Sequence, residues 1–112
     1  MIRIGIDAMG GDFAPNNVIL GAIEAYSYIS ADTKIFLIGD EKKITEVCQH
    51  YGIDSGNFVI VHAPETIEMG EHPIRAFLKK KQSSLVVGFN LLAEGKIDVL
   101  ASAGNTGAML AG

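Results

Sequence analysis

The residues best suited to catalysis or ligand binding lie in two glycine-rich segments. In the first, Asp7 and Asp12 stand on either side of Gly10 and Gly11. Adjacent glycines let a backbone approach a ligand, and carboxylates can orient a cation, accept a proton or cap a helix. A tight turn in which Asp12 bonds backbone N–H groups is an equally good interpretation. The dinucleotide and P-loop fingerprints do not fit, because Asp12 and Gly11 stand where these require glycine and lysine.

The second segment, residues 102–108, reads Ser-Ala-Gly-Asn-Thr-Gly-Ala between an expected strand and an expected helix. Free N–H groups and the positive end of the helix dipole make such a turn suitable for an anion. Asn105 and Thr106 add side-chain donors, and Gly104 and Gly107 lack the Cβ atoms that would hold a phosphate away. A plain helix cap is the alternative, but the polar run at the expected ligand edge favours an anion site.

A third segment combines Arg75 and the run Lys79–Lys81 with Ser83 and Ser84. Lysines bind phosphate as point charges and can also meet an acidic partner. From the sequence alone, a solvated helix face is the favoured explanation of this run.

The histidines and the cysteine are expected to have structural roles. The histidines, which show no metal-ligand spacing, are His50, His62 and His72. Cys48 lies on the inward stripe of an expected helix, where a cysteine is more often part of the core than a nucleophile. The sequence therefore predicts no metal site.

Composition excludes several classes of protein. The 112 residues carry a net charge of −4, so there is no global basic field to hold nucleic acid. The single cysteine rules out an intramolecular disulfide. The longest strongly apolar stretch, residues 85–93, is interrupted by Gly88 and Asn90 and is far shorter than the roughly 20 residues of a spanning helix. We expect a cytoplasmic protein.

Strands and helices alternate along the chain. We expect strands at residues 2–7, 34–38, 58–62 and 97–101, and helices at about 15–26, 41–50, 73–81 and 85–94. This alternation predicts an α/β fold with a mainly parallel sheet and flanking helices. Ligands bind such sheets at the carboxyl ends of the strands, and two of the four loops expected there are the glycine-rich segments.

These segments together resemble those of the bacterial phosphate acyltransferases, which act on acyl carrier protein. Residues 4–15 resemble the opening signature of the family, residues 37–40 match the end of its second strand, and residues 102–108 match its second glycine motif. A central basic-serine segment of the family is matched by Pro73, Arg75, Lys80, Lys81, Ser83 and Ser84. The departures are small, with Phe13 in place of a frequent His and Gln82 in place of a frequent Asn.

The resemblance implies a fold similar to that of phosphotransacetylases and of the isocitrate and isopropylmalate dehydrogenases. Family members are much longer than this chain. Residues 1–112 are therefore expected to be the N-terminal α/β portion of a longer catalytic domain, ending within a helix that begins near residue 105. We expect this portion to be inactive by itself.

The resemblance also implies a reaction. A fatty acyl group moves from the thioester of acyl carrier protein to inorganic phosphate and gives acyl-phosphate for phospholipid synthesis, without a cofactor. The implied partners are acyl carrier protein, phosphate and a second subunit in a homodimer, with peripheral membrane contact through regions absent here and no nucleic acid. The simplest route is direct attack of a phosphate oxygen on the thioester carbonyl.

Roles for the candidate residues follow from this reaction. We predict that phosphate binds at the helix start Gly104–Gly107, helped by Lys81 and Ser84. The backbone amides of Gly10 and Gly11 are candidates for the oxyanion site. Both Asp7 and Asp12 are candidates to orient a donor or act as a base, and the sequence does not choose between them.

Three alternatives belong to other classes. A metal-dependent decarboxylating dehydrogenase would need clustered acidic ligands and a nicotinamide site, and the sequence shows neither. A phosphotransacetylase that uses coenzyme A thioesters, and a non-catalytic phosphate-binding module, both stay open.

Overall fold

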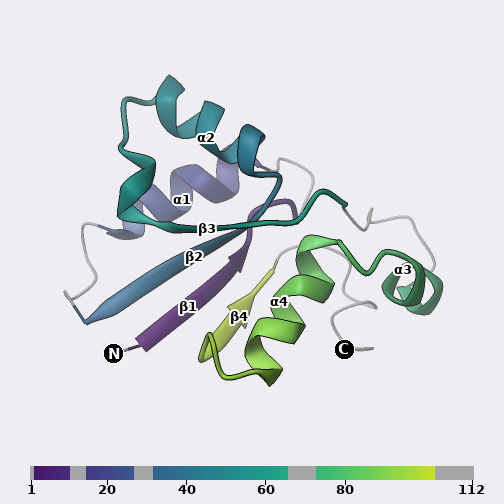
Figure 1. Cartoon of the computed structure of the whole chain (residues 1–112). Helices are drawn as coiled ribbons and strands as arrows, with labels where there is room; N and C mark the ends of the chain where they lie inside the picture. Colours follow the sequence, from purple (N-terminus) through teal and green to yellow (C-terminus); the bar gives the residue numbers. More distant parts are fainter. Residues whose placement is uncertain (1, 11–14, 27–31, 66–72, 103–112) are drawn as a thin grey trace.

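The computed structural model describes residues 2–10, 15–26, 32–65 and 73–102. The chain alternates strands and helices in the order β1 (Ile2–Asp7), α1 (Asn16–Tyr26), β2 (Thr33–Gly39), α2 (Glu41–His50), η1 (Ser55–Asn57, a 3-10 turn), β3 (Val59–His62), α3 (Pro73–Lys79), α4 (Ser84–Ala93) and β4 (Val99–Ala101). The strands form one four-stranded sheet with the order β3-β2-β1-β4 (Figure 1). Each neighbouring pair is parallel, which confirms the predicted α/β class. The likeness to particular dehydrogenase and transacetylase folds stays a prediction.

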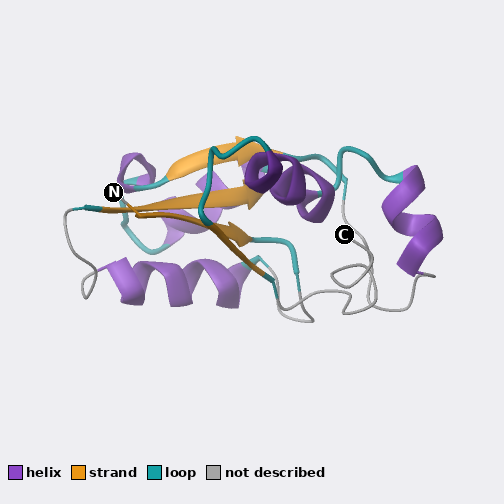
Figure 2. Cartoon of the chain, turned by 90° about the horizontal axis from the view of Figure 1, so that it is seen from below, coloured by secondary structure: helices purple, strands orange, loops and turns teal. Residues whose placement is uncertain are grey.

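The strand order places a topological switch point between β1 and β4. From β1 to β2 to β3 the chain steps in one direction across the sheet, and β4 then lies on the other side of β1. Crossovers between parallel strands are right-handed. The helices that follow β1 and β2 therefore cover one face of the sheet, and the helix that precedes β4 covers the other. Figure 2 shows helices on both sides of the sheet. Ligands of open α/β sheets bind at such a point, outside the carboxyl ends of the strands.

The sheet is covered by two apolar layers. On one face, Ile19 of α1 and Ile44 and Cys48 of α2 pack with Leu37 of β2. On the other face, Ile38 packs with Ile97 and with the apolar side of α4. Leu37 and Ile38 are adjacent and both are fully buried, which explains why the central strand reads as an unbroken apolar run.

Cys48 belongs to this core, as predicted. Its side chain is fully buried, and burial raises the pKa of the thiol above its ordinary value. A protonated, buried thiol is a poor nucleophile, so we assign Cys48 no part in the chemistry.

Polar caps and two glycines define the ends of α2 and α4. The Asp40 side chain accepts a hydrogen bond from the Lys43 N–H at 3.2 Å, and Ser83 accepts one from the Val86 N–H at 3.2 Å. Gly52 and Gly95 follow the helices with φ of 68° and 74°, a region that favours glycine. α2 has the predicted bounds.

Two elements differ from the sequence prediction by two residues at one end, and several others differ by one residue. α3 ends at Lys79 rather than at residue 81, because the chain turns there and the Ser83 N–H bonds the Lys80 carbonyl at 3.0 Å. β4 begins at Val99 rather than at Ile97, whose side chain is buried under α4. A local turn thus shortens α3, and packing against α4 shortens β4.

Within the described ranges, no helix is both long and apolar enough to cross a membrane.

Candidate functional site

Three segments that are far apart in the sequence meet at the carboxylate of Asp7. Asp7 ends β1 and is 4% exposed. Its Oδ1 accepts hydrogen bonds from the Ser84 hydroxyl at 2.5 Å and from the Met9 N–H at 3.0 Å. Its Oδ2 accepts one from the Ser102 hydroxyl at 2.8 Å. We call Asp7, Ser84 and Ser102 the Asp7 cluster; it lies at the switch point of the sheet.

The fold brings these residues together for simple geometric reasons. Ile6 of β1 pairs with Ala101 of β4, so the residues that follow, Asp7 and Ser102, lie side by side at the carboxyl edge of the sheet. Ser84 is the first residue of α4, which covers the face toward which Asp7 points. In Figure 1 the ends of β1 and β4 and the start of α4 converge.

The surroundings of Asp7 compensate for the burial of a carboxylate. Three donors bond its oxygens, and the amino end of α4, where the helix dipole favours negative charge, is adjacent. Throughout the described part of the chain, every buried side-chain nitrogen or oxygen has a hydrogen-bond partner. A buried polar group satisfied in this way is held in one orientation, which is a property of preorganised sites.

Glu65, which the sequence analysis did not single out, joins the loop after β3 to this site. Its carbonyl accepts the Ser84 N–H at 3.1 Å, and its own N–H bonds the Gln82 carbonyl at 3.2 Å. Its side chain accepts the Gln82 N–H at 3.1 Å. These bonds hold the start of α4 beside the end of β3. The only signal in the sequence was the position of Glu65 at the expected ligand edge.

The structure places four of the predicted site residues. Asp7 and Ser84 contact each other, and Ser84 is only 2% exposed. Gly10 is buried in the turn after β1, where its N–H bonds the Asp7 carbonyl at 3.4 Å. Lys81 is exposed in the turn before α4. The remaining predicted residues, Gly11, Asp12, Gly104, Asn105, Thr106 and Gly107, lie outside the described residues, and all these roles stay predictions.

A cavity of about 270 Å³ opens beside the Asp7 cluster. It is lined by Ile6 and Asp7 of β1, Val18 of α1, and Ala101 and Ser102 at the end of β4. Its wall is therefore mostly apolar, with carboxylate and hydroxyl groups at the switch point. This combination suits a ligand with a polar reacting centre and an apolar arm.

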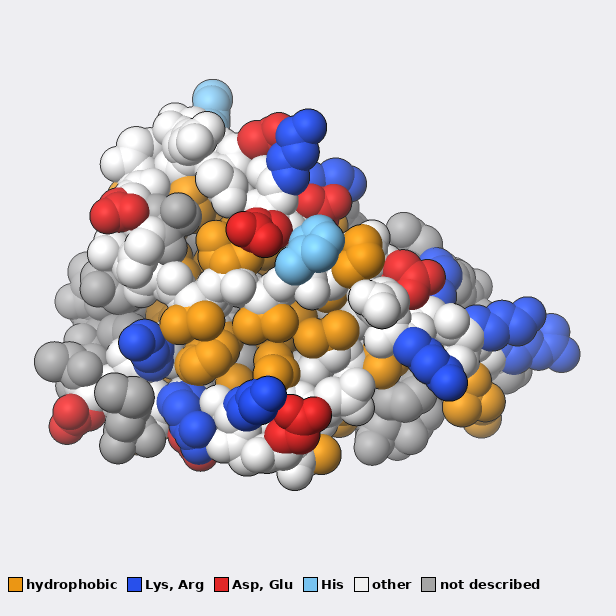
Figure 3. Space-filling view, viewed as in Figure 1, with side chains coloured by type: hydrophobic (Ala, Val, Ile, Leu, Met, Phe, Trp, Pro, Cys, Tyr) orange, Lys and Arg blue, Asp and Glu red, His pale blue; other side chains and the backbone are white. Residues whose placement is uncertain are grey.

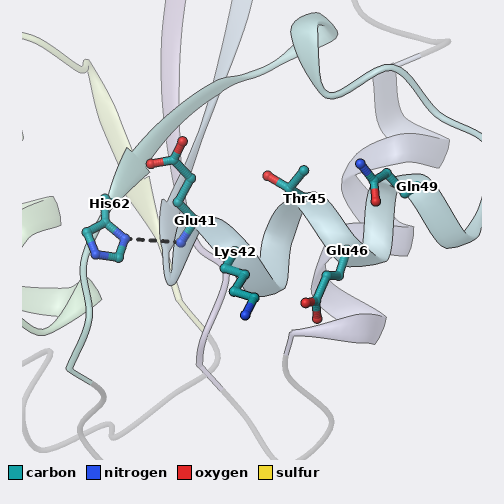
Figure 4. A pocket seen from close by; sticks show the side chains of 6 residues that line it. All are labelled: Glu41, Lys42, Thr45, Glu46, Gln49 and His62. Atoms are coloured by element: carbon teal, nitrogen blue, oxygen red, sulfur yellow. Dashed lines mark hydrogen bonds between the residues drawn. The ribbon is translucent and has the colours of Figure 1, made fainter.

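A larger hollow of about 540 Å³ lies over α2 (Figure 4) and is lined by Glu41, Lys42, Thr45, Glu46, Gln49 and His62. The His62 Nδ1 accepts the Glu41 N–H at 3.1 Å, so His62 satisfies a donor at the start of α2. The lining side chains are those of an exposed helix face with mixed charge. We therefore place the candidate active site at the Asp7 cluster.

The basic segment, by which we mean Arg75 and Lys79–Lys81, lies apart from the sheet. Both views show α3 at one end of the molecule (Figures 1 and 2), and Figure 3 shows Lys and Arg side chains gathered there beside hydrophobic ones. Arg75, Lys79 and Lys81 are exposed, and Ile74 and Leu78 are 57% and 64% exposed.

Among the residues that the structure describes, no three His, Cys, Asp or Glu side chains are grouped so that they could hold a metal ion.

Known proteins are similar to this chain over nearly its whole length. Residues 2–112 match a family model described as "Fatty acid synthesis protein". The chain is 46% identical over 112 residues to a protein of Desulforamulus reducens named "Phosphate acyltransferase", with 99% of this chain and 32% of the relative aligned. Proteins with the same name from Caldicellulosiruptor bescii (45% identity, 99% of this chain, 33% of the relative) and Dictyoglomus turgidum (43%, 97% and 32%) are also similar. The chain spans about a third of the length of these curated relatives.

Proposed function

Because this chain belongs to the fatty acid synthesis protein family, we propose that the full-length protein transfers a fatty acyl group to inorganic phosphate. The observation that carries the proposal is the meeting of Asp7, Ser84 and Ser102 at the switch point. Each comes from a segment that suits phosphate or acyl chemistry, and relatives that align with all of them are named phosphate acyltransferases.

The proposed reaction is a direct displacement. A phosphate oxygen adds to the thioester carbonyl, and the tetrahedral oxyanion re-forms a carbonyl as the C–S bond breaks. The sulfur leaves as the carrier thiol with the proton that the attacking phosphate gives up. The protein must hold phosphate against the thioester, which removes much of the entropic barrier. It must also stabilise the oxyanion with N–H donors. We assign phosphate to the helix start at Gly104–Gly107 with Lys81, and the oxyanion to the amides of Gly10 and Gly11. Ser84, predicted to bind phosphate, supports the site through its hydrogen bond to Asp7.

The proposed acyl donor is acyl carrier protein, and we expect a cytoplasmic homodimer that feeds phospholipid synthesis. We expect any contact with the membrane surface to use other regions of the full-length protein. Acyl-coenzyme A is the competing donor. The apolar arm of either donor suits the cavity beside the Asp7 cluster.

An acyl-transfer assay on the full-length protein tests the function. With long-chain acyl-acyl carrier protein, we expect carrier thiol to be released only when phosphate is present, with acyl-phosphate as product. Turnover with acyl-coenzyme A alone would make the protein a phosphotransacetylase. Binding of phosphate without turnover of either donor would identify a non-catalytic module and reject the proposed function.

Docking of the acidic carrier protein should depend on the basic segment. The variant Lys79→Glu should lower kcat/KM for the acyl carrier protein by about threefold at low salt and weaken its dependence on ionic strength. The control is Lys34→Glu, because Lys34 is exposed at the amino end of β2. Equal losses in variant and control would show only a response to net charge, and no loss would place the docking surface elsewhere.

A further inference from the structure

The Asp7 carboxylate is largely occupied by its own protein. Oδ1 accepts two hydrogen bonds, from Ser84 and Met9, and Oδ2 accepts one from Ser102. A carboxylate has about four acceptor positions, so these donors take most of them. A general base must direct a lone pair at the proton that it removes. Asp7 is only 4% exposed, so little of its carboxylate faces the cavity beside it.

β4 is the element that these hydrogen bonds restrain. It has three residues, lies at an edge of the sheet that the described residues form, and its Val99 is 52% exposed. At its amino end, Asp98 accepts hydrogen bonds from the Arg3 N–H at 2.8 Å and from the Arg3 guanidinium at 3.1 Å. At its carboxyl end, Ser102 bonds Asp7. Carboxylates thus connect β4 to β1 at both ends, and the Asp7 end is where the predicted phosphate loop begins.

We propose that Asp7 is a positioning residue that holds Ser102, and with it the start of the predicted phosphate loop, against the amino end of α4. Ser84 completes the connection, because its hydroxyl bonds Asp7 while its N–H bonds the Glu65 carbonyl. Asp7 then orients Ser102 and is not the general base. The expected effects on the phosphate KM rest on the proposed function, whereas the expected effects on hydrogen exchange do not.

The kinetic test uses Ser102 variants of the full-length protein. Ser102→Ala removes one donor to Asp7 and should raise the KM for phosphate by about tenfold while kcat changes by less than about threefold. Ser102→Thr keeps the hydroxyl and should restore a phosphate KM near that of the wild type. Asp98→Asn alters the other end of β4 and should leave the phosphate KM unchanged. An unchanged KM in Ser102→Ala would overturn the proposal.

Asp7→Asn separates positioning from base catalysis. Asparagine keeps the shape of the side chain and one acceptor oxygen but cannot take up a proton at neutral pH. If Asp7 is a positioning residue, the phosphate KM rises and the pH dependence of kcat keeps its form. A fall of kcat by about a hundredfold or more at saturating phosphate, with loss of the acidic limb of the pH profile, would show that Asp7 is the base.

Hydrogen exchange on the ligand-free full-length protein tests the positioning role of Asp7 without a measurement of enzyme activity. Ser102→Ala should increase amide exchange at the carboxyl end of β4 and at Met9, whose N–H bonds Asp7. Faster exchange in a protein that proves inactive would retain the positioning role and reject the proposed function. Unchanged exchange would reject the positioning role, whether or not the enzyme is active.

Discussion

Replacing Asn105 with aspartate in the full-length protein should raise the KM for phosphate by about tenfold or more. The proposal places phosphate beside this residue, in the loop that follows Ser102. A new carboxylate about 4 Å from a bound anion costs roughly 1 kcal/mol in bulk water and about 4 kcal/mol near a protein surface. Steady-state kinetics at varied phosphate measure the effect directly.

The matched control for this charge change is Asn57→Asp. Asn57 is exposed in η1, just before β3 and therefore at the amino edge of the sheet. The same substitution there should leave the phosphate KM within about twofold of the wild type, because exposed charges separated by more than a Debye length are largely screened. If Asn105→Asp yields an active enzyme with an unchanged phosphate KM, phosphate binds elsewhere.

Replacing Leu37 with alanine should lower the free energy of unfolding by about 2–5 kcal/mol. Leu37 lies in β2, is fully buried, and packs with Ile19 of α1 and Ile44 of α2. The substitution loses the transfer free energy of the side chain and leaves a cavity between three elements that relax only partly. Urea denaturation of the full-length protein, followed by far-ultraviolet circular dichroism, measures the change.

Leu78→Ala is the control for the core substitution. The chemical change is the same, but Leu78 is 64% exposed on α3. We expect its effect on the free energy of unfolding to stay within about 0.5 kcal/mol. Equal losses from the two substitutions would mean that α3 is buried in the full-length protein.

The local elements of this fold could be predicted from the sequence because their signals act over a few residues. The expected helix at residues 41–50 matches α2, and in the structure Asp40 and Ser83 cap α2 and α4 while Gly52 and Gly95 follow these helices. The alternation of strands and helices then predicted a parallel sheet. The same local pattern placed Cys48 in the core.

The sequence also named Asp7 and Ser84 as site candidates, but it assigned Ser84 directly to phosphate. In the structure the Ser84 hydroxyl points at Asp7 and is buried, a direction that no periodicity encodes. Ser102 belonged to the predicted phosphate loop, but neither Ser102 nor Glu65 was predicted to have a role in the site. Partners separated by 77 and 95 residues meet only when the chain is folded.

The sequence by itself thus determined the kinds of element, their approximate ends and the loops that carry polar residues. Only the tertiary structure decided that β4 returns to the far side of β1, and with it which loops share one site. The physical reason is the range of the forces. Capping, turn formation and amphipathic periodicity depend on neighbours within one or two turns of chain. Strand order depends on crossover hand and on the packing of α1, α2 and α4 against opposite faces, which involve the whole chain at once.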